Sequence, residues 1–288
     1  MTDFLEQVIG ERRADVKRDK GRMDEASLLI RAQERMVTRR RNRWATGDAR
    51  AMSDPFTAAL SLRHGQLGVI AEVKRRSPAL GPLQPDADAL TVAIAYEAAG
   101  ATAISVLTEP RHWGGSLEDL MAVADAVSIP ILCKDVIVDE FQVLEAAAAG
   151  ADAVLLIAEA LSDDELRRFV ARARAFRMGA LVEAHEPVAF GRAVRAGSFV
   201  VGVNARNLRE PAEIDVGRVR QLHTFAREGQ VLVAESGIDS VDDARLLPAR
   251  VDAVLVGTAL MRSADPAPLI KGLTAIRRKG APTVTVRP

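Results

Sequence analysis

Short runs rich in Val, Ile and Leu recur along the chain, and this rhythm limits the possible folds more than any other feature. Eight such runs follow one another: LGVIAEV (67–73), TAISVLT (102–108), IPILCKD (129–135), DAVLLIA (152–158), GALVEA (179–184), FVVGVN (199–204), QVLVAES (230–236) and DAVLVG (252–257). They are largely apolar throughout rather than alternating, which is typical of parallel strands that are buried on both faces.

The stretches between these runs have helical composition. Several begin with Asp or Ser and end near Gly, as in DEFQVLEAAAAG, and these are the usual signals for a helix start and stop. Segments such as EAAGATAISVL, AAAGADAVLLI and VRAGSFVVGV lead from a helix into a strand with a period of roughly 25 residues, which indicates βα units in series. We therefore predict an α/β fold, a (β/α)8 TIM barrel, with an open doubly wound sheet as the alternative.

Composition excludes several classes of protein. The 39 basic and 39 acidic residues cancel, so the whole chain is not a polyelectrolyte partner for nucleic acid. No apolar run reaches the roughly 18 residues of a membrane span, and MTDFLEQVIGERR is too charged for a signal peptide. The single cysteine, Cys133, excludes an internal disulfide framework and fits a reducing compartment. We expect a cytoplasmic protein, a monomer or weak homo-oligomer, that binds neither nucleic acid nor membranes.

The first 55 residues differ from the rest. DFLEQVIGERRADVKRDKGRM has apolar residues at roughly helical spacing, and a basic stretch without a clean period follows it. We predict two parts, a helical and basic N-terminal extension (1–55) and a barrel catalytic domain (56–288). The run from Arg39 to Arg43 is either a solvated connector or an attractor for an anionic ligand.

Polar residues gather where the predicted strands end. In a barrel of parallel strands these ends meet at one mouth, where chemistry takes place. Two lysines and three glutamates at one rim are improbable as packing, although a layer of salt bridges that closes the barrel is the structural alternative. The residues at these ends are Glu72, Lys74, Lys134, Glu183, Asn204, Arg206, Glu235 and Ser236.

Lysines and glutamates held together in a partly desolvated cleft are suited to general acid–base catalysis, because their pKa values can shift toward neutrality. A Schiff base on Lys134 or Lys74 is the competing use of a lysine. The four histidines, His64, His112, His185 and His223, are scattered, and Cys133 should point away from the lumen side that Lys134 occupies. We therefore expect no metal site.

Two turns near the end of the chain resemble a phosphate cradle. AESGI (234–238) and LVGTALM (255–261) place Gly where a strand turns into a helix, after the seventh and eighth predicted strands. Such turns offer backbone amides to an anion. The expected donors are Ser236, Gly237, Gly257 and Thr258, and Ser77 in RRSPALG could join them from the first loop.

The motifs reached so far resemble one family closely. IAEVKRRSP, ISVLTEPRHWGGSLEDL, PILCKDVIVDEFQVLEAAAAGADAVLLIA, LVEAH, VGVNARNL, VLVAESGI and DAVLVGTALMR are similar, in order, to those of indole-3-glycerol-phosphate synthases. The resemblance spans about residues 55 to 265, and the N-terminal segment resembles the family's extension, which covers the barrel mouth. It implies conversion of 1-(2-carboxyphenylamino)-1-deoxyribulose 5-phosphate to indole-3-glycerol phosphate, with release of CO2 and water and without a cofactor.

The resemblance also implies roles for the residues at the strand ends. Lys134 would protonate the ribulose carbonyl, and Glu183 would act as the base or stabilise the cationic intermediate. Lys74 would hold the substrate carboxylate and Glu72 would position it, although which lysine donates in which step stays open. Asn204 and Glu235 would complete the polar wall. Arg206 and Trp113 join the set that would bind substrate, and Ser77, Ser236, Gly237, Gly257 and Thr258 would hold its phosphate.

The chain departs from the family pattern around the mouth. Val136 stands where the family has a Phe that packs on the substrate ring, a loss of about 1 kcal/mol of stacking for which Trp113 could compensate. Arg76, Leu80 and the segment REPAEIDV also differ from the family. The alternatives are therefore a diverged paralogue that acts on a related anthranilate-derived substrate in a specialised indole pathway, a phosphosugar isomerase or aldolase, and a non-catalytic barrel subunit.

Overall fold

The computed structural model of the protein describes residues 3–43, 54–61 and 65–278, with the backbone alone for 39–43. Eight parallel strands close into a barrel in which β1 pairs with both β4 and β10. The barrel prediction is therefore confirmed, and the open sheet is wrong. The strands are β1 (Gly68–Val73), β4 (Ala103–Leu107), β5 (Ile131–Lys134), β6 (Ala153–Ile157), β7 (Gly179–Ala184), β8 (Val200–Asn204), β9 (Val231–Glu235) and β10 (Ala253–Val256).

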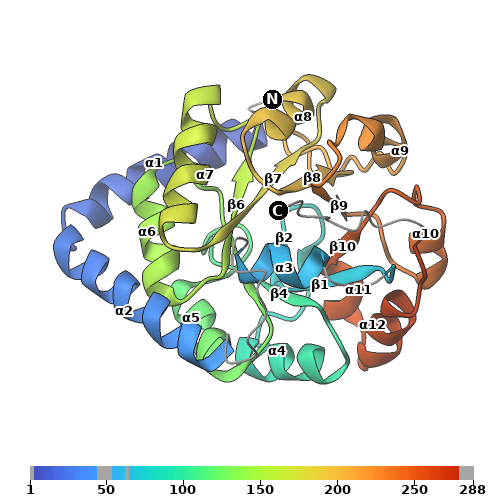
Figure 1. Ribbon diagram of the computed structural model, residues 1–288, viewed down its shortest axis with the longest axis horizontal. Helices are drawn as coiled ribbons and strands as arrows, with labels where there is room; N and C mark the ends of the chain where they lie inside the picture. The colour runs from blue at the N-terminus through green and yellow to red at the C-terminus, as the bar shows by residue number, and fades with distance from the viewer. Residues whose placement is uncertain (1–2, 44–53, 62–64, 279–288) are drawn as a thin grey trace, which may run out of the picture.

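Helices follow the strands and surround the barrel (Figure 1). The expected start and stop signals hold: Ser162 and Glu165 form a reciprocal capping box, and Gly150 ends α6 with a φ of 93° that favours glycine. The helices of this ring are α4 (Ala89–Ala98), α5 (Leu117–Ala126), α6 (Glu140–Ala149), α7 (Asp163–Ala175), α8 (Pro187–Arg195), α9 (Arg218–Leu222), α10 (Val241–Arg245), α11 (Thr258–Arg262) and α12 (Ala267–Thr274), with a 3-10 turn at His223–Phe225.

One element was not predicted. The loop after β1 folds into a small antiparallel hairpin of β2 (Arg76–Ser77) and β3 (Gly81–Pro82). Ser77 pairs with Gly81, whose φ of 72° lies in the left-handed region. The hairpin gives the first loop a defined shape at the rim of the barrel.

Two apolar clusters hold the fold together. The larger one lies between the strands and the surrounding helices, and includes Tyr96, Phe169 and Phe190. The smaller one fills the barrel interior with residues such as Ile70, Leu132 and Leu181. Because successive strand residues point to opposite faces, the continuous apolar runs of the sequence supply both clusters at once.

The helices that precede β1 lie in three places, and the last of them, α3, begins where the predicted extension ends. Helix α1 (Phe4–Lys20) contributes Leu5 and Val8 to the inner cluster beside Val136 at the mouth. Helix α2 (Glu25–Arg43) packs against the outside of α6, and α3 (Pro55–Ser61) places Phe56 and Leu60 in the same inner cluster, where it contacts β7 and β9. The predicted cover over the mouth is therefore α1 alone.

The basic run from Arg39 to Arg43 forms the end of α2, so its backbone is helical rather than a connector. Its side chains lie outside the described residues, and its proposed attraction for an anion is not tested. In the part of the chain that the structure describes, no helix has the length and apolarity to cross a membrane.

Candidate active site

Strands β1 and β5 bring two lysines close to one carboxylate. Glu72 on β1 lies 2.6 Å from the Nζ of Lys74, through Oε1, and its Oε2 lies 3.7 Å from the Nζ of Lys134, at the end of β5. Glu72 is only 3% exposed, so this cluster is largely removed from water. The predicted shared face of Glu72 and Lys74 is therefore confirmed.

On the opposite wall, β7, β8 and β9 contribute Glu183, Asn204 and Glu235. The amide of Asn204 donates to Glu183 Oε1 at 3.4 Å, and its Oδ1 accepts from Ser236 Oγ and the Arg206 backbone N–H, both at 2.9 Å. Both carboxylate oxygens of Glu235 and Oε2 of Glu183 are buried and accept no hydrogen bond from a donor among the described residues, while a proton on Glu235 would join the two carboxyl groups to each other. Orphaned buried oxygens are costly, so this wall is arranged for a ligand rather than for stability.

Mutual charge sets the protonation of these groups. Burial acts to lower the pKa of Lys134, but the carboxylates of Glu183, Glu72 and Glu235 outweigh it and raise that pKa above its ordinary value. Burial acts to raise the pKa of Glu72, yet the ammonium groups of Lys74 and Lys134 hold it below its usual range. The expectation that the lysines shift toward neutrality is therefore wrong for Lys134, because three carboxylates surround it.

Glu235 behaves in the opposite way. Burial, reinforced by the negative charge of Glu183, raises the pKa of Glu235 well above its ordinary value, and the nearby Lys134 only partly offsets this. The cluster thus contains a firmly protonated ammonium and a carboxyl group that is inclined to keep its proton. Both groups can serve as proton donors.

Two glycines make room for the carboxylates. A Cβ at Gly202 would lie 2.1 Å from Glu235 Oε1, and one at Gly257 would lie 2.2 Å from Glu72 Oε1. Gly257 was predicted only as an amide donor, and Gly202 was not singled out. A glycine inside the apolar run FVVGVN is the signal that could have revealed it, because glycine in a strand often marks a close approach.

The predicted site residues other than Glu183 line one cavity of about 620 Å3 at the mouth. Ser77 on the hairpin and the turns after β9 and β10 form one part of its wall. Sequence reasoning missed Arg262 and Ser263, which follow the second turn and line the same cavity. The predicted residues that line it are Glu72, Lys74, Ser77, Trp113, Lys134, Asn204, Arg206, Glu235, Ser236, Gly237, Gly257 and Thr258.

A second, smaller pocket adjoins this cavity and is mainly apolar. Phe4, Leu5 and Val8 of α1 line it together with Leu155, Val136 and Leu208, among others. Glu183, the remaining predicted catalytic residue, lines it, and Lys134 and Trp113 line both spaces. All thirteen predicted site residues therefore surround two connected spaces, one polar and one apolar.

The residues that depart from the family pattern lie in different places. Val136 is 4% exposed in the wall of the apolar pocket, and Leu80 lines the polar cavity. Arg76 is exposed and lies against Gly114 rather than in the cavity wall. Within the segment 209–216, Pro211 and Ile214 line the cavity. Each of these except Arg76 can therefore touch a ligand.

The loop that carries Trp113 is held by a residue that sequence reasoning missed. The buried carboxylate of Glu109 accepts hydrogen bonds from the backbone N–H groups of Arg111, His112 and Trp113 at 2.6 to 3.2 Å. Trp113 also makes an edge contact with Phe4, at 6.0 Å between ring centroids. The indole ring is thus fixed between the two spaces.

Within the described ranges, no group of His, Cys, Asp and Glu side chains is arranged to hold a metal ion. Cys133 packs in the outer cluster, 3.5 Å from Thr108 Oγ1, as its position next to Lys134 predicted. The raised pKa of Lys134 leaves little neutral amine, which disfavours a Schiff base on it.

Comparison with known proteins agrees with these features. The family model described as indole-3-glycerol phosphate synthase matches residues 5–273. An indole-3-glycerol phosphate synthase of Nocardioides sp. is 51% identical over 211 residues, which cover 72% of this chain and 80% of that protein. One from Laribacter hongkongensis is 39% identical over 277 residues, or 96% of this chain and 100% of that one.

Among solved structures, 3-hexulose-6-phosphate synthase from Salmonella typhimurium superimposes with a TM-score of 0.58 at 18% identity. The match covers 72% of this chain and 97% of that one. At this identity the likeness shows the barrel fold alone.

Proposed function

The chain belongs to the indole-3-glycerol phosphate synthase family, and on that premise we propose how its own residues close the indole ring. As a carboxy-lyase of tryptophan biosynthesis, it converts 1-(2-carboxyphenylamino)-1-deoxyribulose 5-phosphate to indole-3-glycerol phosphate with loss of CO2 and water. One observation carries the assignment of roles: the ammonium of Lys134 lies among three buried carboxylates at the junction of a polar and an apolar space.

The two spaces match the two halves of the substrate. The phosphate would bind between Ser77 and the turns after β9 and β10, where Ser236, Gly237, Gly257 and Thr258 offer hydroxyl and amide donors. The aromatic ring would occupy the apolar pocket against Val136 and Trp113, under α1. The ribulose carbonyl then falls near Lys134, which lines both spaces.

Ring closure begins with proton donation. Lys134 gives a proton to the carbonyl oxygen while the ring carbon that bears the carboxylate attacks the carbonyl carbon, so that one carbon–carbon bond forms and a hydroxyl replaces the ketone. Lys74, held 2.6 Å from Glu72, would pair with the substrate carboxylate. The positive charge that develops on the nitrogen and ring would face Glu183, whose Oε2 has no protein partner.

Loss of CO2 and of water completes the product. The carboxylate leaves as CO2 and its bonding electrons restore the aromatic ring. The new hydroxyl then leaves as water after protonation, and the adjacent carbon loses a proton to form the indole double bond. Glu183 is the proposed acceptor of that proton. The amide of Asn204 orients the Glu183 carboxylate through the 3.4 Å hydrogen bond.

All of these groups come from one chain, so the proposed chemistry needs no second subunit. The expectation of a monomer or weak homo-oligomer can be checked by sedimentation velocity at several protein concentrations.

The decisive test follows indole fluorescence during turnover of the carboxyphenylamino substrate. We expect Lys134→Ala to lower kcat by about 100-fold or more, the usual contribution of a general acid. Lys271→Ala, which changes an exposed lysine on α12, is the matched control and should keep full activity. A Lys134→Ala variant with more than a tenth of the normal kcat would remove Lys134 from the role of acid. A wild-type protein that binds phosphate but makes no product would favour the diverged paralogue.

A further inference from the structure

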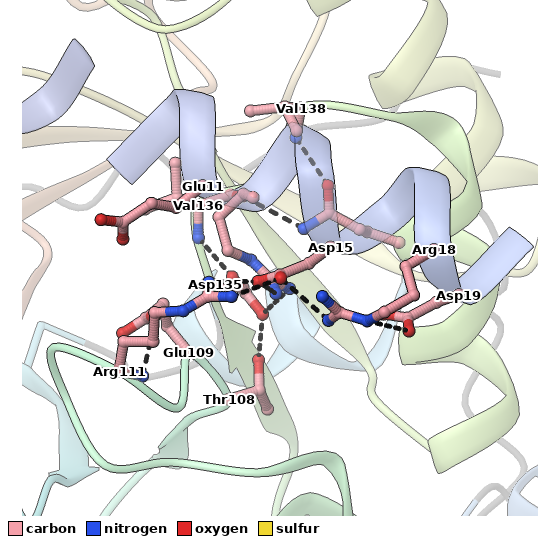
Figure 2. A network of polar contacts seen from close by, with 12 residues as sticks. Glu11, Asp15, Arg18, Asp19, Thr108, Glu109, Arg111, Asp135, Val136 and Val138 are labelled. Carbon is pink, nitrogen blue, oxygen red and sulfur yellow. Dashed lines mark hydrogen bonds and ion pairs between the residues drawn. The ribbon is translucent and has the colours of Figure 1, made fainter. Parts of the chain in front are cut away.

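Helix α1 carries two charged residues on its buried stripe. Leu5, Val8 and Val16 are buried on this face, and Arg12 and Asp15 share it at helical spacing. Asp15 is only 2% exposed and contacts the guanidinium groups of Arg12, Arg18 and Arg111, the last from the loop after β4 (Figure 2). A helix that merely shielded the barrel would bury apolar side chains here, because a buried ion pair is a poor source of stability.

The network ends at the residue after Lys134. Asp135 is 7% exposed, and its carboxylate accepts three hydrogen bonds from three parts of the chain. Arg12 Nη2 of α1 donates at 2.9 Å, Thr108 Oγ1 at 2.8 Å, and the backbone N–H of Val136 at 2.7 Å. Figure 2 shows Thr108, Asp135 and Val136 close together beside α1. Docking of α1 therefore supplies one of the three donors that hold Asp135, and the one that is charged.

The backbone of Lys134 is held by the same Thr108 that holds Asp135. Its backbone carbonyl accepts from the N–H of Thr108 at 3.0 Å, and the hydroxyl of the same Thr108 holds Asp135. Beyond Lys134 strand β5 ends, and the backbone on that side is held by the Asp135 carboxylate at the N–H of Val136 and by the Gln142 side chain at the carbonyl of Val136. If the Asp135 carboxylate moved, the peptide after Lys134 would therefore rotate and the Lys134 side chain would change its direction.

We propose that Arg12, acting through Asp135 and Thr108, is a positioning residue for Lys134, so that docking of α1 and placement of the general acid are a single event. This inference rests on the proposed function for its activity readout. It also gives α1 a role beyond covering the apolar pocket. When α1 is undocked, the pocket is open and Lys134 is misplaced, so the substrate is not protonated while it is exposed to solvent.

The charges around Asp135 make the link sensitive to pH. Burial raises the pKa of Asp135, and Arg12 and Thr108 oppose that effect. Without Arg12 the carboxyl would take up a proton at a higher pH and lose its grip on Thr108 and Val136. The charged and titratable groups that face Asp135 are Arg12 and Asp15 of α1, Glu109 and Arg111 of the loop after β4, Glu145 of α6, and its neighbours Cys133 and Lys134.

The test compares two ties between α1 and the barrel. Arg12→Gln removes the donor to Asp135, whereas Lys20→Ala removes an exposed ion pair of α1 with Asp139 at 2.7 Å and leaves Asp135 untouched. We expect Arg12→Gln to lower kcat by about 10- to 100-fold with KM changed by less than about 3-fold, the cost of a misplaced catalytic group. Arg12→Lys should recover part of kcat, and Lys20→Ala should keep it.

The pH profile and amide exchange distinguish positioning from simple loss of the helix. The acidic limb of kcat should move up by about 1 pH unit in Arg12→Gln, because an opposite charge is lost from beside a carboxylate. Hydrogen exchange of the amides of Thr108 and Val136 should quicken in Arg12→Gln and not in Lys20→Ala, whether or not the protein turns over substrate. An inactive wild type with this exchange pattern would overturn the proposed function and keep the link.

The proposal fails on either of two results. If Arg12→Gln raises KM and leaves kcat unchanged, α1 is only a cover. If the exchange of Thr108 and Val136 is unchanged, Arg12 does not hold Asp135. Thr108→Val, which removes the hydroxyl donor from inside the barrel wall, should reproduce the kcat effect if Arg12→Gln does not fold.

Discussion

At the amino-terminal end of the barrel, buried carboxylates accept hydrogen bonds from backbone amides, whereas at the mouth several carboxylate oxygens have no partner. Asp152 accepts from the N–H of Ile131 and Asp252 from that of Leu232, both at 2.8 Å. Asp54 accepts from the N–H of Thr57, also at 2.8 Å. At the mouth, by contrast, Glu235 has two buried oxygens without a partner and Glu183 has one.

The carboxylates at the amino-terminal end of the barrel therefore contribute to stability, whereas those at the mouth contribute to function. A buried carboxylate that is satisfied by a backbone amide fixes the chain locally and costs little. One that is left unsatisfied costs stability, and a ligand that donates to it can offset that cost. The two ends share the same strands, so single substitutions at each end should change different properties.

The largest effect should come from closing the space at the mouth. The methyl group added by Gly202→Ala would lie only 2.1 Å from Glu235 Oε1 and 3.3 Å from the Cβ of Glu183, so the Glu235 carboxylate would have to move. We expect kcat to fall by about 100-fold, because displacing a catalytic group by an ångström has that order of cost. Steady-state kinetics with circular dichroism as a fold control measures this. Full activity would mean that the Glu235 carboxylate does not need its present place.

A substitution at the other end should do the reverse. Asp54 occupies the position before α3 and accepts from both the N–H and the hydroxyl of Thr57, the latter at 2.7 Å. Asp54→Ala should cost about 1 to 2 kcal/mol of unfolding free energy, the loss of a helix cap, with kcat unchanged. Asp54→Asn keeps an acceptor and is the matched control. Urea unfolding followed by turnover assays tests the pair, and a large drop in kcat would break the division between the two ends.

The smallest effect concerns the side of the barrel where α1 and α6 meet. Burial, with the negative charges of Asp19, Asp135 and Asp139, raises the pKa of Glu145 from 4.5 to about 7, and Arg12 only partly opposes this. The folded protein thus binds this proton more tightly than the unfolded chain, so stability falls as pH rises from about 4.5 to 7. Glu145→Gln should remove that slope and gain about 1 kcal/mol over wild type at pH 8. Parallel urea unfolding at pH 5 and pH 8 gives the slope, and identical slopes would contradict the prediction.

Much of the site could be predicted because it lies in local patterns. Glu72, Lys134 and Glu183 each interrupt or end an apolar run, and parallel strand ends must meet at one edge. The spaces for Glu235 and Glu72 left no such mark except two glycines, Gly202 within β8 and Gly257 directly after β10. The pKa of Lys134 was mispredicted for the same reason: its direction depends on how many carboxylates reach it, which no local pattern records.

The eight parallel strands, their burial on both faces and the polar edge can be predicted from the chain alone, because these follow from periodicity and from the residue at each strand end, whereas closure into a barrel needed the pairing of β1 with β10. Tertiary packing decided that α1 rather than α2 or α3 covers the mouth, that α2 lies against α6 and that α3 plugs the far end. It also decided that Arg12 meets Asp135, 123 residues away. A helix carries its amphipathic face in its own sequence, but the surface that receives that face is built from strands and loops distant along the chain.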